Sequence, residues 1–130
     1  MKILFDTNVL ISAFITSGGY SHEILKHAVH QHELYYTDFI LHELKEKLKY
    51  KFNFSNAVIL RFIEFIEQFL THGKTAASIE RVCRNTDDDQ VLADAIANIV
   101  DLIITGDNDL LVLKTHKTVR ILHPKDYGFI

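Results

Sequence analysis

Short apolar runs alternate with longer amphipathic stretches along the chain. Several of the runs are three to five residues long and stop at polar residues, which is typical of buried strands of a parallel sheet. The strands predicted in this way cover 1–5, 34–36, 102–104 and 119–122. A weaker strand is expected around 74–78.

Between these runs, apolar residues recur every three or four positions, which predicts amphipathic helices. The predicted helices cover 7–15, 21–32, a stretch that begins at 37 or 38, 55–70, 86–100 and 108–113. Strands that alternate with helices favour parallel pairing through right-handed crossovers. We therefore expect an α/β fold, a three-layer α/β/α sandwich with a parallel central sheet, in a single domain over residues 1–130.

The composition agrees with a globular protein. The chain has 130 residues, of which 48% are hydrophobic and 24% charged, so it can bury its own core and is too apolar for a disordered segment. The single cysteine, Cys83, excludes an internal disulfide and favours a reducing compartment. Asp6 and Asn8 interrupt what would be the core of a signal peptide, and the apolar runs are too short to span a bilayer. We expect a cytoplasmic protein with no membrane partner.

Charge is distributed unevenly along the chain. The segment 87–109 contains seven Asp and no Lys or Arg, whereas a lysine occupies every second position from 45 to 51. This pattern indicates an acidic site beside a basic surface. The net charge of −3 does not decide for or against nucleic acid, because two bound divalent cations would change it to +1.

Two acids follow predicted strands. Asp6 comes directly after the first strand, and Asp107 comes shortly after the strand at 102–104. In parallel sheets, ligands bind beyond the carboxyl ends of the strands, so both side chains belong at that edge. Two unpaired carboxylates repel each other unless a proton or a cation intervenes, and Mg²⁺ or Mn²⁺ prefers such oxygen ligands.

The angle between successive helical residues selects which other acids can join them. In the helix over 86–100, the buried face is expected at Leu92, Ile96 and Ile99. Asp89 lies on that face, whereas Asp94 points to solvent. The candidate set, which adds a glutamate beside the apolar stripe of the third helix, is Asp6, Glu43, Asp89 and Asp107, with Asp88 and Asp109 in reserve.

Each acid also has a purely structural interpretation. Asp6 and Asp107 stand where they would cap the following helix, and Asp89 stands three residues after Thr86, at the acidic position of a capping box. Glu43 alone would be an ordinary solvated residue. Because four unrelated residues have no reason to converge on one sheet edge, a shared acidic site is favoured.

Other chemistry has less support. The eight histidines lack cysteine partners and an H-E-x-x-H pattern, and Cys83 lacks a visible His/Asn arrangement. The chain has no G-x-x-x-x-G-K or G-x-G-x-x-G motif, which argues against a nucleotide-binding fold.

Four motifs resemble those of the PIN domain family, in the branch of toxin components of bacterial and archaeal toxin–antitoxin systems. They are F-D-T-N at 5–8, I-L-H-E-L at 40–44, D-D-D-Q-V-L-A-D-A at 87–95 and I-T-G-D-N-D-L at 104–110. The resemblance runs through essentially the whole chain. It implies a Mg²⁺- or Mn²⁺-dependent ribonuclease, a hydrolase, on a small α/β/α sandwich.

The resemblance also implies roles for particular residues. The acids of the family fall on Asp6, Glu43, Asp89 and Asp107. Asn8 and Thr105 match polar positions that orient these carboxylates. Many relatives have Asp-Pro where this chain has Asn85-Thr86, which leaves the choice among Asp87, Asp88 and Asp89 open.

The implied chemistry is hydrolysis of a phosphodiester bond. Asp6, Asp89 and Asp107 would hold the principal ion, which lowers the pKa of a water for in-line attack, and Glu43 would complete a second ion site or position that water. The products would carry 5′-phosphate and 3′-hydroxyl ends. Single-stranded or looped RNA is the favoured substrate class. Its contacts would be Lys45, Lys49, Lys51 and Arg84, for which solubilising surface charge is an equal explanation.

An antitoxin protein is the partner that the resemblance implies, and the oligomeric state, including a homodimer, stays open. Two other functions use the same features. A phosphohydrolase of small phosphoesters could use the same acids, although no phosphate-binding loop is visible. A non-catalytic module that binds RNA or protein would require only the fold.

Overall fold

The computed structural model describes residues 1–16 and 18–130, and over these residues it forms a six-stranded sheet. The order across the sheet is β3-β2-β1-β4-β6-β5, in which β5 is antiparallel to β6 and all other neighbours are parallel. The strands are β1 (Lys2–Phe5), β2 (Glu33–Tyr36), β3 (Thr71–His72), β4 (Leu102–Ile104), β5 (Thr115–His116) and β6 (Val119–Leu122).

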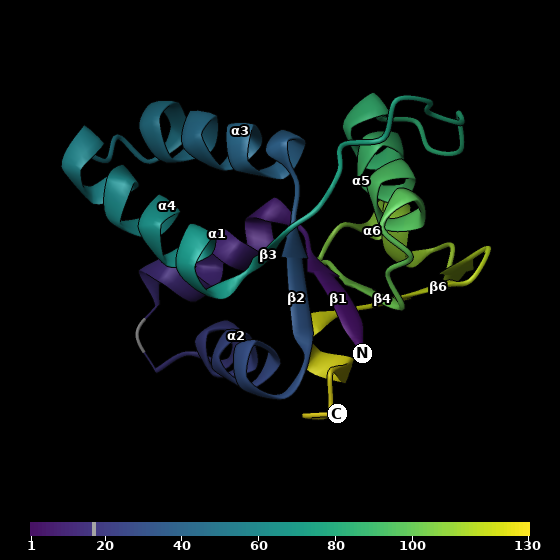
Figure 1. The fold of residues 1–130 in the computed structure, drawn as a ribbon, viewed down its shortest axis with the longest axis horizontal. Coiled ribbons are helices and arrows are strands. Elements are labelled where there is room, and N and C mark those ends of the chain that lie inside the picture. The colour runs from purple at the N-terminus through teal and green to yellow at the C-terminus, as the bar shows by residue number, and fades with distance from the viewer. Residues whose placement is uncertain (17) are drawn as a thin grey trace.

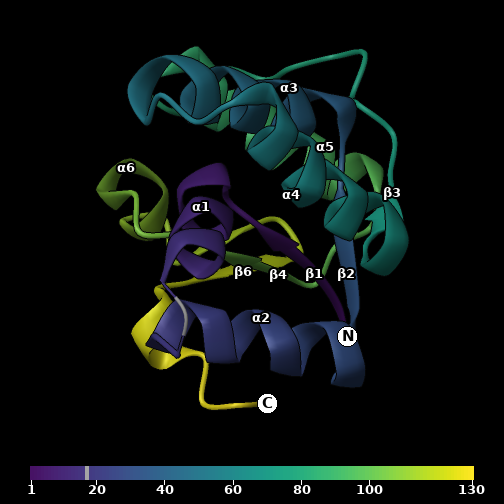
Figure 2. The same ribbon diagram turned by 90° about the vertical axis from the view of Figure 1, so that its left-hand side faces the viewer.

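Helices cover both sides of this sheet. The helices are α1 (Thr7–Ile15), α2 (Tyr20–Gln31), α3 (Asp38–Glu46), the π-helix η1 (Lys47–Lys51), α4 (Asn56–Phe69), α5 (Thr86–Ala97), α6 (Asn108–Leu111) and the 3₁₀-helix η2 (Pro124–Asp126). Helices α1 to α4 lie on one side of β1 and β2, and α5 lies on the other (Figure 1). Figure 2, in which the side with α1 to α4 faces the viewer, shows α1 between α2 and the pair α3 and α4. The predicted α/β class with a mainly parallel, helix-flanked sheet is therefore confirmed.

The two central strands explain why the sheet forms. Ile3, Leu4 and Phe5 of β1 are at most 1% exposed, and all three residues of β4 are fully buried. Strands that are covered on both faces are uniformly apolar, which is why these runs were recognisable in the sequence. Phe5 pairs with Ile104 at the last position of both strands. The residues that follow these two strands consequently emerge side by side.

The weak strand expected around 74–78 is wrong. The third strand is Thr71–His72 instead, and the segment after it contains no strand. Side chains at the end of α5 bind backbone N–H groups that a strand would need: Asn98, the C-cap of α5, accepts from the N–H of Lys74 at 2.9 Å, and Asp94 of α5 accepts from that of Ala76 at 2.7 Å.

The helix over 86–100 is shorter than the periodicity predicts. It ends at Ala97, and Ile99 beyond it has φ +54° and is 73% exposed. The third helix, in contrast, continues from α3 directly into η1. No helix in residues 1–16 and 18–130 is long and apolar enough to cross a membrane.

Candidate active site

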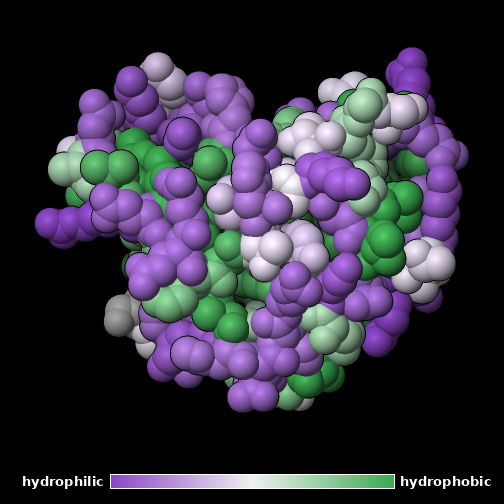
Figure 3. Space-filling model, in the orientation of Figure 1, coloured by the Kyte–Doolittle hydropathy of each residue, from purple (hydrophilic) through white to green (hydrophobic). Residues whose placement is uncertain are grey.

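A cleft of about 100 Å³ lies at the carboxyl ends of β1 and β4. In the orientation of Figure 1, hydrophilic side chains cover the upper rim over α3, and a notch separates this rim from the side that carries α5 (Figure 3). The cleft is lined mainly by acids and amides: Asp6, Asn8, Glu43, Lys47, Asn85, Asp87, Asp88, Val91 and Asp107.

Asp6 is fixed by hydrogen bonds to both carboxylate oxygens. Its Oδ1 accepts from the N–H of Thr7 at 2.8 Å, which makes it the N-cap of α1, and its Oδ2 accepts from the Thr105 hydroxyl at 2.8 Å. The same Thr105 oxygen accepts from the backbone N–H of Asp107 at 3.0 Å, so one hydroxyl links the two acids. Burial raises the pKa of Asp6, although these hydrogen bonds oppose the shift. Asp6 therefore caps α1 and also lines the cleft.

Three further carboxylates meet at this point. Asp88, Asp107 and Asp109 each present an oxygen within 4.8 Å of the other two. Asp107 caps α6 by accepting from the N–H of Asp109 at 2.8 Å. Asp109 also accepts from the Arg84 guanidinium at 2.8 Å.

Asp88 is the least satisfied member of this group. It is 6% exposed, and its buried Oδ2 has no hydrogen-bond partner within residues 1–16 and 18–130. Burial, reinforced by the nearby charges of Asp107 and Asp6, raises the pKa of Asp88 to about 7. A cation beside this carboxylate would favour its charged form and so oppose that shift.

The predicted position of Asp89 needs correction. Asp89 does not line the cleft, and its Oδ1 accepts from the backbone N–H of Val82 at 3.0 Å and of Cys83 at 2.7 Å. These bonds, that of Cys83 foremost, lower the pKa of Asp89, so it is an ionised anchor for the segment before α5. The structure thus places Asp88, the reserve candidate, in the cleft.

The error in the helix phase has a clear origin. Ile96, which the periodicity places on the buried face close to the direction of Asp89, is only partly buried, and Ile99 lies past the end of α5. The buried face is centred on Val91, Leu92 and Ala95 instead. Asp88 precedes Val91 by one helical turn and therefore shares its direction.

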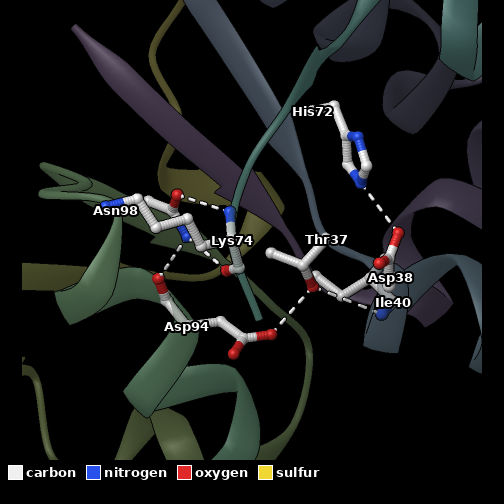
Figure 4. Close-up of polar contacts among 7 residues, drawn as sticks. All are labelled: Thr37, Asp38, Ile40, His72, Lys74, Asp94 and Asn98. Carbon is white, nitrogen blue, oxygen red and sulfur yellow. Dashed lines mark hydrogen bonds and ion pairs between the residues drawn. The ribbon is translucent and has the colours of Figure 1, made fainter. Parts of the chain in front are cut away.

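Asp94, predicted to face solvent, is also misplaced by the sequence pattern. It is fully buried, and its Oδ2 accepts from the Thr37 hydroxyl at 2.8 Å. Figure 4 shows this bond beside the paired contacts of Asn98 with Lys74. Asp94 joins α5 to the start of α3 and has a structural role away from the cleft.

The helical glutamate, Glu43, reaches the cleft from the α3 side. Its Oε1 lies 4.0 Å from Nζ of Lys47, one turn further along, and this ammonium donates to Oδ1 of Asn8 at 3.1 Å. Sequence reasoning missed Lys47, although its spacing of four residues from Glu43 is the usual signal for a helical ion pair. It brings a positive charge into a mainly acidic cleft.

The candidate RNA contacts differ in their surroundings. Lys45, Lys49 and Lys51 are exposed around η1, on the side of the cleft that carries Glu43. Arg84 is exposed as well, but its guanidinium already pairs with Asp109.

The fold and the cleft define an α/β domain with a group of carboxylates at the carboxyl ends of its two central strands. A family model described as "PIN domain" matches residues 2–109, and the chain belongs to this family. PIN domains are generally nucleases. The matched segment includes every acid of the cleft and ends at Asp109.

The fold is also similar to a solved structure, the crystal structure of VapBC2 from Rickettsia felis bound to a DNA fragment from their promoter. The TM-score is 0.70 at 12% sequence identity, with 95% of this chain and 98% of that chain covered. At this identity, the likeness concerns the fold. A comparison with curated proteins finds no match.

Proposed function

We propose that this protein is an endoribonuclease that depends on Mg²⁺ or Mn²⁺ and acts as the toxin component of a toxin–antitoxin pair. The observation that carries the proposal is the meeting of Asp88, Asp107 and Asp109 within 4.8 Å of one another, in a chain whose fold also brings Asp6 to the same cleft. Acids that follow β1 and β4 lie there beside an acid of α5. Their mutual repulsion destabilises the metal-free protein.

The donor set fits a hard divalent cation. It consists of carboxylate oxygens, which Mg²⁺ and Mn²⁺ prefer. The buried Oδ2 of Asp88 has no hydrogen-bond partner within residues 1–16 and 18–130, and a cation beside it would stabilise a carboxylate whose pKa burial raises to about 7. We therefore assign Asp6, Asp88 and Asp107 as the principal ligands, with Asp109 beside them. Bound there, the ion would supply positive charge for attack on a phosphodiester.

The remaining residues position and balance the reaction. Thr105 holds Asp6 and Asp107 in a fixed relation through one hydroxyl. Glu43 lies across the cleft, where its carboxylate could accept a proton from an attacking water, and Lys47 offers an ammonium to a substrate phosphate. We infer that Asn8, which accepts from Lys47, keeps this lysine directed at the cleft.

RNA as substrate and an antitoxin as partner rest on the family. The chain is a PIN domain, and its four motifs resemble the toxin branch. The similar structure is of VapBC2 and contains promoter DNA, which agrees with a partner protein for this chain. The fold likeness supports this partnership without identifying the partner.

Cleavage of labelled single-stranded RNA tests the proposal. The wild type should cleave with Mg²⁺ or Mn²⁺ and stop in EDTA, and Asp6→Asn purified in parallel should be inactive, because it removes a ligand with little change in size. Equal cleavage by both proteins would indicate a contaminating ribonuclease and contradict the proposal. RNA binding without cleavage would favour the binding module, and hydrolysis of small phosphoesters alone would favour the phosphohydrolase.

A further inference from the structure

The segment around η1 has a combination of features that the acidic cleft does not explain. We propose that single-stranded RNA extends from the cleft along the basic strip, defined as residues 45–51, with a base stacked on Tyr50 and phosphates on the lysines. This inference rests on the proposed ribonuclease function and deepens it by assigning the residues that hold the substrate outside the cleft.

Surface hollows form a continuous path from the acids to this strip. The acidic cleft shares Lys47 with a neighbouring hollow that is also lined by Glu46, Tyr50 and Lys51. That hollow shares Glu46 and Tyr50 with a third one. The third hollow is lined by Lys45, Glu46, Lys49, Tyr50, Asn56 and Ile59. A chain that leaves the cleft beside Lys47 therefore meets these two hollows next.

The local backbone explains why the side chains of the strip face outward. Leu48 is fully buried and anchors the strip to the core. The π-helical bond from the N–H of Phe52 to the carbonyl of Lys47, at 3.1 Å, widens the turn between them. Such wide turns are rare and often occur at functional sites. With Leu48 as the inward residue, Lys49, Tyr50 and Lys51 are exposed together.

The exposed side chains combine an aromatic ring with positive charge. Tyr50 is 68% exposed, and Nζ of Lys49 lies 5.4 Å from the centre of its ring. Nζ of Lys51 lies 5.8 Å from the centre of the Phe52 ring. A base stacked on Tyr50 would thus have an ammonium beside it for the attached phosphate. Aromatic rings interleaved with cations are the usual platform for single-stranded nucleic acid.

The strip is basic and the cleft is acidic, although the two share Lys47. The charge of the strip favours a polyanion as its ligand. The strip carries four lysines and one glutamate, a formal charge of +3, while the cleft is dominated by carboxylates. A nuclease whose catalytic acids repel its substrate needs cations nearby to hold the phosphates. Single-stranded RNA uses both features at once, a base on the Tyr50 ring and phosphates on the adjacent lysines, so we assign the strip to RNA.

Fluorescence anisotropy with a short labelled single-stranded RNA in EDTA tests this assignment. The parent protein is Asp88→Asn, which lowers the negative charge of the cleft and disables cleavage. Adding Tyr50→Ala should weaken binding about fivefold or more, from the usual contribution of one stacked base. Tyr50→Phe should bind like the parent, because the ring is retained. Lys51→Gln should reduce the slope of log K against log[salt] by about 0.7.

Matched controls lie on α2, on the other side of α1 from α3 (Figure 2). Tyr20 is 45% exposed and Lys26 is exposed too, so Tyr20→Ala and Lys26→Gln should leave RNA binding and its salt slope unchanged. Unchanged binding in Tyr50→Ala, or an equal loss in Tyr20→Ala, would overturn the assignment. Poly-glutamate that binds as tightly as RNA would also overturn it, by showing that the strip selects charge alone.

The readout is independent of catalysis. If the wild type does not cleave RNA in Mn²⁺ while the Asp88→Asn parent binds RNA through Tyr50, the proposed ribonuclease is refuted and the strip stands. If the wild type cleaves RNA in Mn²⁺ but adding Tyr50→Ala to the parent leaves RNA binding unchanged, only the strip is refuted.

Discussion

Replacing Asp88 with asparagine should stabilise the metal-free protein at pH 8 and have a much smaller effect at pH 5. Burial and the neighbouring carboxylates raise the pKa of Asp88 from 3.8 to about 7 in the folded state. The folded protein therefore holds this proton more tightly than the unfolded chain, and its free energy of unfolding falls as the pH rises from about 4 to 7. The shift corresponds to about 4 kcal/mol in full, of which roughly 2–3 kcal/mol is lost between pH 5 and 8. Asparagine does not titrate, so the variant avoids this loss.

Urea denaturation of the wild type and Asp88→Asn in EDTA, followed by circular dichroism at both pH values, measures the difference. Asp87→Asn is the matched control, because Asp87 is exposed in the same helical turn. The free energy of unfolding of Asp87→Asn should be lower than that of the wild type by only about 0.3–1 kcal/mol at both pH values, because the variant loses the attraction between the Asp87 charge and the N-terminus of α5. Parallel pH profiles for the wild type and Asp88→Asn would refute the reasoning. Mn²⁺ at about 100 times its Kd should add about 2.7 kcal/mol to the free energy of unfolding of the wild type and of Asp87→Asn, and less to that of Asp88→Asn.

Three further predictions concern other parts of the molecule. Calorimetry should show Mn²⁺ binding that is weakened in Asp107→Asn and retained in Asp87→Asn; equal affinities would exclude Asp107 as a ligand. Asp94→Ala should lower the free energy of unfolding by about 1–3 kcal/mol, because it leaves the buried Thr37 hydroxyl without its acceptor, and an unchanged urea midpoint would contradict that role. Burial, together with nearby carboxylates, raises the pKa of Cys83 to about 11, so iodoacetamide should modify it more slowly than a free cysteine at pH 7.5; equal rates would show that the thiol is not shielded.

Local sequence signals were sufficient for the residues at the strand ends. Asp6 and Asp107 each follow an apolar run, and adjacent parallel strands necessarily bring such positions together. The same signals located the main strands and the helices between them. The end of each strand is marked by a change from apolar to polar residues. That change is visible in the sequence without knowledge of tertiary contacts.

Choices that depend on tertiary contacts could not be made in this way. Asp88 and Asp89 are adjacent acids, and the direction of the buried face of α5 decides which one faces the cleft. Periodicity included Ile96 and omitted Val91 and Ala95, which rotated the expected face toward Asp89. The buried carboxylate of Asp94 was equally invisible, because its partner Thr37 lies 57 residues away in sequence. No strand forms at 74–78, because Asp94 of α5 and its C-cap Asn98 accept hydrogen bonds from backbone N–H groups of that segment.

The comparison of Asp88→Asn with Asp89→Asn in metal-dependent RNA cleavage tests the central claim most directly. Both substitutions remove one negative charge from neighbouring positions of α5, but only Asp88 lines the cleft. Under single-turnover conditions with Mn²⁺, Asp88→Asn should lose orders of magnitude in rate, and Asp89→Asn should stay within about tenfold of the wild type. A dominant loss in Asp89→Asn, with Asp88→Asn near the wild type, would contradict the assignment of the cleft as the active site.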